Sequence, residues 1–312
     1  MFLCSIEIII IVYKNYPLQN STMKLKIFSC FMLFCFLQTS FILSDDKPAY
    51  IIYNSKGEQV DYSEMIKQLK KADVAFFGEL HNNPISHWLQ LEVTKDLYKA
   101  KKSDLVLGAE MFEADNQLIL DEYLADMISK SNFKKEAKLW PNYDTDYQPL
   151  VEFAKGNKLD FIATNIPRRY ASTVFKKGIE YLDSLPDASK KYIAPLPIKV
   201  DLELESYKSM LEMMRGHGEN TNFPKAQAIK DATMAHFILK NWKKGQLFLH
   251  YNGAFHSDIY EGINWYIKDQ RKKTKIATIS TVEQDDVSSL LEENKGKADF
   301  IICVPSSMTK TH

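Results

Sequence analysis

Cysteine is scarce in this sequence, and its scarcity excludes two kinds of stabilisation. Cys4, Cys30 and Cys35 lie in an amino-terminal stretch that we expect to be removed, which leaves Cys303 alone in the rest of the chain. A single cysteine can form neither an intramolecular disulfide nor a thiolate metal cluster. Because residues 300–304 are strand-like and apolar, we interpret Cys303 as a buried small side chain.

The sequence also lacks an excess of charge of either sign. Forty lysine and arginine residues stand against 40 aspartate and glutamate residues, so the formal net charge is zero. Without net charge, no long-range field draws the chain to nucleic acid or to an anionic membrane. We therefore predict no nucleic-acid partner. A chain of 312 residues is long enough to bury a substantial core.

Long apolar runs are missing too, although residues 1–44 contain short ones. From Met23, lysines precede the apolar run 27–37 and small residues follow it, which is typical of a secretory signal. Each run is shorter than the roughly 20 residues of a membrane-spanning helix. We predict that residues 1–44 are a leader and that residues 45–312 form one α/β domain, exported to the periplasm or cell envelope. An uncleaved membrane anchor is the alternative, and the pattern before Cys30 resembles a lipidation signal only faintly.

Short apolar runs alternate with longer helical patterns from residue 45 onward. This alternation predicts an α/β fold with a mostly parallel central sheet flanked by helices. The predicted strands are residues 50–53 (an edge), 74–78, 105–110, 161–165, 247–251, 276–280 and 300–304. The predicted helices are residues 63–71, 84–100, 115–128, 148–156, 201–214, 224–243 and 258–271. Between about 183 and 243 no strand is predicted, and we expect an all-helical insertion there, as a lid or small subdomain.

Polar side chains follow four of the predicted strands. Glu79 and His81 end one strand, Glu110 the next, Asn165 a third and His256 a fourth. Because ligands bind at the carboxyl ends of strands in open α/β sheets, these residues could surround one cavity. Two carboxylates and two imidazoles could bind a divalent metal ion or exchange protons. Each could instead cap a helix or stabilise a turn, but the coincidence at four strand ends favours a shared site.

Two further features suit a large or anionic ligand. Arg168 and Arg169 lie near the same rim, and guanidinium groups suit carboxylates or phosphates, although a solvated pair is an equal alternative. The aromatic loop 140–149 carries phenols that could stack on or ligate something planar, since tyrosine is a known axial ligand of haem iron. His87, on a predicted surface helix, is expected to be solvated.

Six short segments resemble, in the same order, the ChaN-type haem-binding, iron-regulated proteins of the Tiki superfamily. The segments are Phe77–His81, Leu107–Phe112, Tyr147–Leu150, Ala163–Arg168, Gln227–Ala235 and Gly253–His256. The resemblance implies an exported α/β protein that binds haem and takes part in its uptake or handling. It also allows a homodimer that pairs two haems, and envelope transport components as partners.

The resemblance also suggests which residues contact haem. A tyrosine is expected to reach the iron in that family, and Tyr147 lies in the matching segment, with Tyr143 as a weaker candidate. Arginine side chains would face the propionates. The candidate haem-binding residues are Tyr147, Arg168, Arg169, Asn165, His217 and Tyr170.

A metal-dependent hydrolase is the alternative function. The same superfamily includes Tiki-type metalloproteases and erythromycin-esterase-like hydrolases, which resemble this chain at its Gly-Glu-x-His and Gly-x-x-His pieces. In that hypothesis the histidines and one glutamate hold a divalent ion that activates water, and the other glutamate is the general base. The residues concerned are Glu79, His81, Glu110 and His256. Whether the protein is an enzyme stays open at this point, and the cluster could also serve only to hold loops together.

Overall fold

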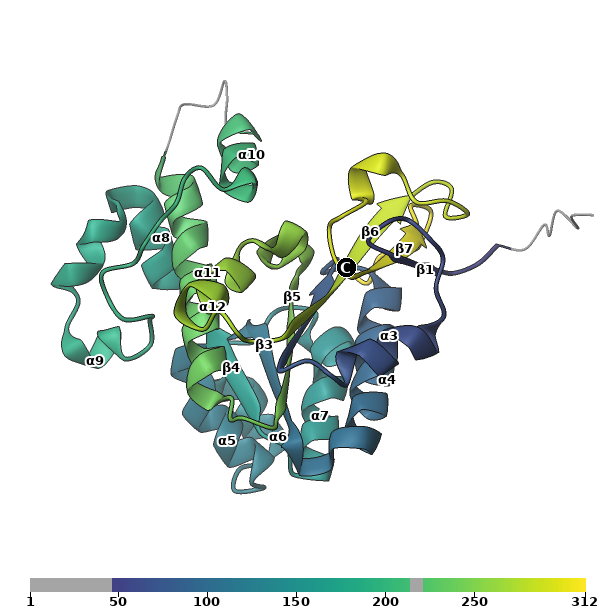
Figure 1. The fold of residues 1–312 in the computed structure, drawn as a ribbon. Helices are drawn as coiled ribbons and strands as arrows, with labels where there is room; N and C mark the ends of the chain where they lie inside the picture. The colour runs from purple at the N-terminus through teal and green to yellow at the C-terminus, as the bar shows by residue number, and fades with distance from the viewer. Residues whose placement is uncertain (1–46, 214–220) are drawn as a thin grey trace, which may run out of the picture. The chain divides into compact units, whose positions relative to one another are not determined.

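The computed structural model describes residues 47–213 and 221–312, which are built around a 7-stranded sheet (Figure 1). The strands are β1 (Ile51–Asn54), β2 (Val74–Glu79), β3 (Leu105–Glu113), β4 (Phe161–Asn165), β5 (Leu247–Gly253), β6 (Ile276–Gln284) and β7 (Phe300–Pro305). Their order across the sheet is β1-β7-β6-β2-β5-β3-β4. Only β1, at an edge, pairs antiparallel with its neighbour, so the predicted mostly parallel α/β sheet is confirmed.

The helices flank this sheet. They are α3 (Tyr62–Leu69), α4 (Pro84–Lys101), α5 (Gln117–Leu124), α6 (Lys130–Glu136), α7 (Gln148–Asn157), α8 (Arg168–Lys177), α9 (Asp187–Lys190), α10 (Glu205–Met213), α11 (Asn222–Asn241) and α12 (Ile263–Gln270). Three of them, α6, α8 and α9, were not expected from the sequence. None of the helices in the described ranges is both long and apolar enough to cross a membrane. The predicted leader lies outside the described residues and stays a prediction.

Strand residues alternate between the two faces of the sheet, as the period of two requires. In β2, Ala75 and Phe77 join the core packed under α3, α4 and α7, whereas Val74 and Phe76 join the core under α10, α11 and α12. Figure 1 shows α3, α4 and α7 on one side of the sheet and α11 and α12 on the other. Both faces are therefore covered by helices, which explains why β2 is apolar without interruption from Val74 to Phe77.

The helical insertion is larger than predicted. Between β4 and β5 the described residues contain helices and loops but no strand, and the first helix begins at Arg168 rather than near residue 183. Helix α8 has only a narrow apolar stripe, in which Tyr170, Ala171 and Val174 pack with α11 in a separate small core. These buried residues recur three and four positions apart, so the sequence does contain the helical periodicity of α8.

Gly78 allows the segment after β5 to approach β2 closely. A Cβ atom at this position would lie 2.9 Å from the Ala254 Cα atom and 2.9 Å from the Ile279 carbonyl oxygen. Both are backbone atoms in the middle of the fold, so they cannot move aside without shifting β6 or the loop that follows β5.

We predict that Gly78→Ala lowers the free energy of unfolding by roughly 1–3 kcal/mol, because the added methyl group overpacks this contact. The measurement is urea unfolding followed by circular dichroism. Gly156→Ala in α7 is the matched control, since nothing lies within 4 Å of its Cβ position. Alanine is favoured over glycine in a helix by about 0.5–1 kcal/mol, so this control should be neutral or stabilising. Equal stability of the two variants would contradict the prediction.

Candidate functional site

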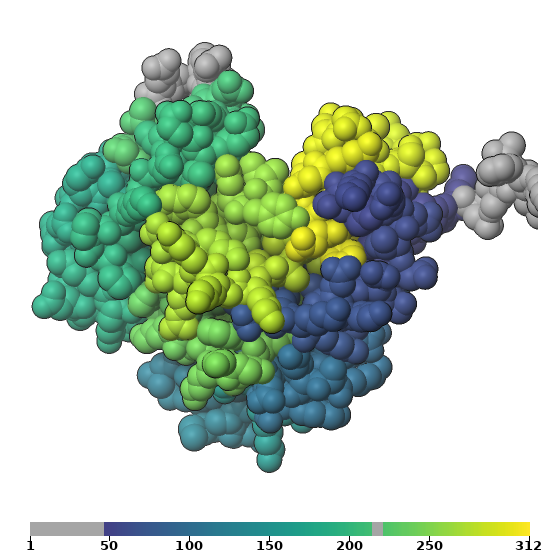
Figure 2. All heavy atoms as spheres, viewed as in Figure 1, coloured from purple at the N-terminus to yellow at the C-terminus, as the bar shows by residue number. Residues whose placement is uncertain are grey.

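A cavity of about 1100 Å³ lies at the carboxyl ends of the strands. Its floor includes residues that end β2, β3, β4 and β5, and its walls come from α8, α11 and the loop that contains Leu139, Trp140 and Pro141. His312 also lines it. Figure 2 shows the surface hollowed between the green helical insertion and the yellow carboxyl-terminal segment. Such a cavity is where an open α/β sheet is expected to bind its ligand.

Helices α8 and α11 each turn one face toward the cavity. In both helices the lining residues follow the spacing i, i+3, i+4, i+7, which places them on one side of the helix. From α8 these residues are Arg168, Ala171, Ser172 and Phe175, and from α11 they are Phe223, Ala226, Gln227 and Lys230. Each helix therefore contributes apolar side chains together with one cation.

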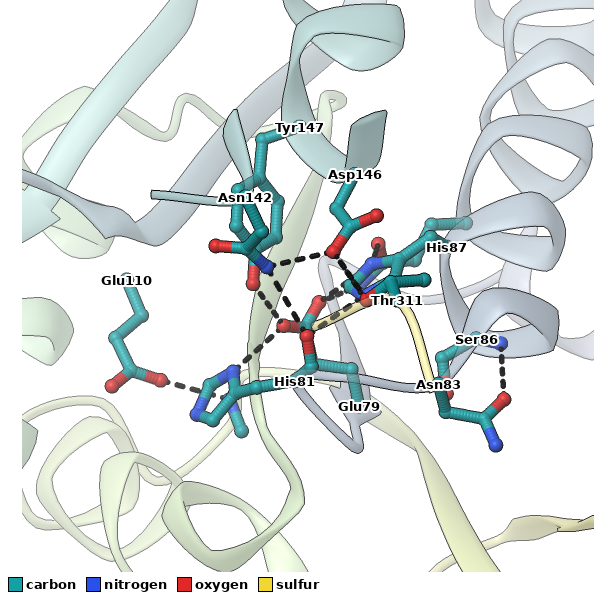
Figure 3. Close-up of polar contacts among 12 residues, drawn as sticks. Glu79, His81, Asn83, Ser86, His87, Glu110, Asn142, Asp146, Tyr147 and Thr311 are labelled. Atoms are coloured by element: carbon teal, nitrogen blue, oxygen red, sulfur yellow. Dashed lines mark hydrogen bonds and ion pairs between the residues drawn. The ribbon is translucent and has the colours of Figure 1, made fainter. Parts of the chain in front are cut away.

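Glu79 and His81 form a hydrogen-bonded pair at the end of β2 (Figure 3). Nδ1 of His81 lies 2.8 Å from Oε1 of Glu79, whose side chain is completely buried. The Tyr147 hydroxyl donates to the same oxygen at 2.8 Å, and the Gln90 amide donates to Oε2. Burial alone would lower the pKa of His81, but the hydrogen bond to Glu79 and the charge of Glu110 raise it above its usual value.

A buried polar network holds the loop that carries His81. Nε2 of His87 lies 3.0 Å from the His81 carbonyl oxygen and 3.3 Å from Oδ2 of Asp146. Asn142 donates to the same carbonyl oxygen at 3.2 Å and to Asp146 at 2.7 Å, and the Thr311 hydroxyl also donates to Asp146. The prediction that His87 is solvated is therefore wrong, because its helix packs this face against the sheet.

A second buried cluster surrounds His256, just after β5. Its Nδ1 atom lies 2.5 Å from Oδ1 of Asp231, and its Nε2 atom lies 3.2 Å from Oε1 of Glu110. The other oxygen of Glu110 accepts a hydrogen bond from the backbone N–H of Gly253 at 2.8 Å. The Tyr207 hydroxyl donates to Asp231 at 3.1 Å. Because Asp231 belongs to α11, this cluster connects the helical insertion to the sheet.

The two carboxylates keep His256 protonated. Burial alone would lower the pKa of His256, but the negative charges of Glu110 and Asp231 outweigh it and raise the pKa to about 9. Burial likewise acts to raise the pKa of Glu110, yet the positive charge of His256 holds that pKa below its usual range. Both ring nitrogens of His256 are then donors, so His256 is poorly suited to bind a metal ion or accept a proton.

The four residues predicted as a metal or catalytic set do meet at one edge of the sheet. A Cβ atom on Gly253 would lie 2.7 Å from Nε2 of His81 and 3.6 Å from Oε2 of Glu110, so the absence of a side chain there leaves room between the two clusters. The residues are arranged as hydrogen-bonded pairs, however. Within the described residues, no group of three or more His, Cys, Asp or Glu side chains could hold a metal ion.

Three of the predicted haem-binding residues lie away from the cavity lining. Tyr147 is 1% exposed and lies beneath the cavity, where its hydroxyl contacts Glu79. Burial and the nearby negative charge of Glu79 also raise the pKa of Tyr147 far above its usual value, which opposes the tyrosinate that would bind iron. Tyr170 is buried under the guanidinium group of Arg169, which forms an ion pair of 2.6 Å with Asp115.

The other predicted haem contacts fall into two groups. Arg168 and Asn165 line the cavity, and Oδ1 of Asn165 is buried there with no hydrogen-bond partner in the described ranges. His217 lies outside the described residues. Sequence reasoning missed Asp231, Asp146 and Lys230, although Asp231 and Lys230 belong to the segment Gln227–Ala235 that carried the family resemblance.

We predict that raising the pH from 6.5 to 9.5 destabilises the protein through His256. The pKa of His256 rises from about 6.5 to about 9 on folding, so its contribution is complete below pH 6.5 and is lost as the pH passes 9. The loss corresponds to roughly 3 kcal/mol at most. Unfolding in urea should therefore depend on pH in this range for the native protein, and much less for His256→Gln. Parallel pH profiles for the two proteins would refute the prediction.

Comparison with known proteins identifies the family to which the chain belongs. A family model described as "Haem-binding uptake, Tiki superfamily, ChaN" matches residues 65–267. The structure of ChaN from Campylobacter jejuni, which describes cofacial haem binding, superposes with a TM-score of 0.61 at 19% identity, covering 81% of this chain and 96% of that one. This likeness shows the fold.

Two further matches are more distant. An erythromycin esterase structure gives a TM-score of 0.48 at 10% identity, covering 84% of this chain and 98% of that one. The Arabidopsis thaliana protein RETICULATA-RELATED 5, chloroplastic, is 27% identical over 141 residues, which are 43% of this chain and 19% of that protein. The chain thus matches about a fifth of that curated relative. Since the family model covers most of the chain, the protein belongs to the ChaN family of haem-binding uptake proteins in the Tiki superfamily.

Proposed function

We propose that this protein binds haem in the cavity at the carboxyl ends of the strands. The observation that carries the proposal is the match to a haem-binding family together with a cavity of about 1100 Å³ at the edge where such a fold binds ligands. Pockets for small molecules and cofactors usually measure about 300–1,000 Å³, so this cavity can accept a ligand as large as a porphyrin.

The side chains that line the cavity suit a flat, apolar ligand with anionic arms. Trp140, Phe175, Phe223 and Phe255 supply aromatic surface on several sides of the cavity. Aromatic rings favour stacked or edge-on contacts with a planar partner. A porphyrin ring is such a partner, and burying it between these residues would remove a large apolar area from water.

Two cations of the cavity suit the propionate groups of haem. Arg168 and Lys230 line it, and neither forms an ion pair with any residue in the described ranges. Lys138 also lines it but pairs with Glu113 at 2.6 Å. A guanidinium group recognises a carboxylate through paired hydrogen bonds, so Arg168 is the first candidate for a propionate contact.

The proposed biological role is the uptake or handling of haem iron outside the cytoplasm. The leader predicted for residues 1–44 supports export, and the family description supports uptake. Because cofacial haems are described for the Campylobacter jejuni protein, a homodimer that pairs two haems is part of the proposal. Envelope transport components would then be the partners that deliver or receive haem.

We predict that Arg168→Ala weakens haem binding about three- to fivefold, since an exposed ion pair contributes up to about 1 kcal/mol. Arg169→Ala is the matched control, because its guanidinium group pairs with Asp115 away from the cavity. Titration with ferric haem, followed by the Soret absorption band, measures both affinities. The difference should shrink in high salt, which screens exposed charges. Failure of the native protein to bind haem saturably would contradict the proposed function.

A hydrolase is the second candidate, and the pair formed by His81 and Glu79 favours it. A carboxylate that is hydrogen-bonded to an imidazole orients the ring as a general base, and both His81 and Glu110 lie near the position that a Cβ atom on Gly253 would occupy. This candidate predicts hydrolysis of activated esters or peptides that His81→Ala abolishes. In the metal-dependent form, a chelator should abolish the same activity. Hydrolysis that is unaffected by His81→Ala would exclude these residues as the catalytic set.

A further inference from the structure

We propose that the end of the sheet opposite the cavity docks on a membrane surface that contains anionic phospholipids. Five connections lead into the amino-terminal ends of five adjacent strands there, β2 to β6. We call this end the basic face, and it consists of residues 70–73, 101–104, 158–160, 242–246 and 271–275. The inference does not depend on the haem-binding function proposed above.

The sheet places these five connections side by side. The strands they enter are neighbours in the order β6-β2-β5-β3-β4 and are parallel, so all five begin at one edge. The backbone N–H of Asp73 donates to the carbonyl oxygen of Lys275 at 2.8 Å, which joins two of the connections directly. Figure 1 shows the connection from α11 to β5 at the end of the sheet away from α10. Because adjacent strands lie about 4.8 Å apart, the five connections form a row roughly 20 Å long.

The connections in this row are strongly basic. They contain 11 lysine and arginine residues against three aspartates and no glutamate. Nearby ion pairs use other lysines, Lys99 with Asp96 and Lys155 with Asp126, and none of the 11 pairs with a residue that the structure describes. All of them except Lys70 and Lys101 are exposed, and the full set is Lys70, Lys71, Lys101, Lys102, Lys158, Lys243, Lys244, Arg271, Lys272, Lys273 and Lys275.

Helix dipoles explain only part of this positive charge. Helices α3, α4, α7, α11 and α12 all end at the basic face, and the carboxyl end of a helix carries about half a negative charge, which favours a nearby lysine. Five such ends amount to roughly 2.5 negative charges. The three aspartates add three more. The 11 cations outnumber both contributions together, so the basic face keeps a positive surplus.

Acidic side chains gather at the opposite end of the same strands. The connections that follow β2 to β6 contain eight aspartates and glutamates and two lysines, in residues 80–83, 114–116, 166–167, 254–262 and 285–299. A net charge of zero is therefore the sum of two unlike ends, and the field near the basic face is positive. This field falls off within about 8 Å in physiological salt, so it acts on a surface that lies directly against the basic face.

The makeup of the basic face favours a lipid surface over a compact anion. Ten of its 11 cations are lysines, which are flexible point charges, whereas paired recognition of a single phosphate favours arginine. The helices present carbonyl groups here, not the N–H groups that bind phosphate at a helix N-terminus. The cavity of about 680 Å³ beside Lys158 is also lined by Asp121, Asp126 and Asp160, which repel an anion. A row of exposed lysines suits headgroup phosphates that are spread over a surface.

A membrane is also the anionic surface that fits the rest of the chain. The leader predicted for residues 1–44 would export the protein, and an exported chain meets lipid rather than nucleic acid. Clusters of about four to eight lysine and arginine residues already bind anionic lipids, and the basic face carries 11. Docking would turn the cavity away from the lipid, because the cavity lies at the carboxyl ends of the same strands.

The test is sedimentation of the full-length protein with vesicles of phosphatidylcholine alone or mixed with phosphatidylglycerol. The native protein should bind the mixed vesicles more tightly, and the difference should disappear in 1 M salt, where the Debye length is about 3 Å. Each lysine at such a surface contributes roughly fivefold in affinity. Binding to the mixed vesicles should therefore weaken on the order of 100-fold in a variant that combines Lys243→Gln, Lys244→Gln, Lys272→Gln and Lys273→Gln.

A matched control removes four lysines from the helical insertion, away from the basic face. It combines Lys176→Gln, Lys177→Gln, Lys190→Gln and Lys191→Gln, so both variants have the same net charge. The control should bind mixed vesicles as the native protein does. Equal weakening in both variants would overturn the proposal, because net charge and not the basic face would then determine binding. Unchanged melting temperatures and unchanged haem titrations of the two variants separate a surface effect from a loss of folding or of the cavity.

Three other results would also overturn the proposal. Equal binding to both kinds of vesicle would show that apolar contacts hold the protein on the membrane. Tighter binding to duplex DNA than to mixed vesicles, lost in the variant of the basic face, would assign this face to nucleic acid. Competition by inorganic phosphate at constant ionic strength would indicate a compact phosphate site in place of a lipid surface.

Discussion

The buried carboxylate of Glu79 is the constraint on which the rest of the site depends. A carboxylate removed from water costs several kcal/mol unless donors surround it. Here the donors are His81, Tyr147 and Gln90, which come from the loop after β2, the segment before α7 and helix α4. Satisfying one buried charge therefore fixes three separate parts of the chain around the end of β2, and it turns His81 toward the cavity.

A second buried group of charges positions the opposite wall. Asp231 lies on α11, whereas His256 and Glu110 belong to the ends of β5 and β3, so their contacts hold the helical insertion against the sheet. Because both partners of His256 are carboxylates, removing either one would leave a buried charge poorly compensated. The cavity thus lies between two polar clusters, and two of its cations, Arg168 and Lys230, form no ion pair with any residue that the structure describes.

The sequence predicted the sheet well because strand length and apolar continuity are local properties. All seven strands and the edge position of β1 agree with expectation, and the contact between Glu79 and His81 follows from their spacing of two along an extended chain. His87 was wrongly predicted to be solvated and Asp231 was missed, because the burial of a residue on a helix is not a local property. Each lies on a helix, and which face of a helix is buried depends on the neighbours that tertiary packing brings to it.

Tyr147 shows that a sequence motif does not determine what its residues contact. Residues 143–147 form a single π-helical turn, in which Asp146 and Tyr147 are both buried. Such turns add a residue to the helical repeat and often occur at functional sites. Here the turn directs the phenol to Glu79, while Trp140, earlier in the same loop, lines the cavity. The aromatic residues of one loop are thus divided between the ligand surface and the support behind it. The hydroxyl of Tyr147 shares Oε1 of Glu79 with His81, so Tyr147 is connected to the cavity lining through that carboxylate.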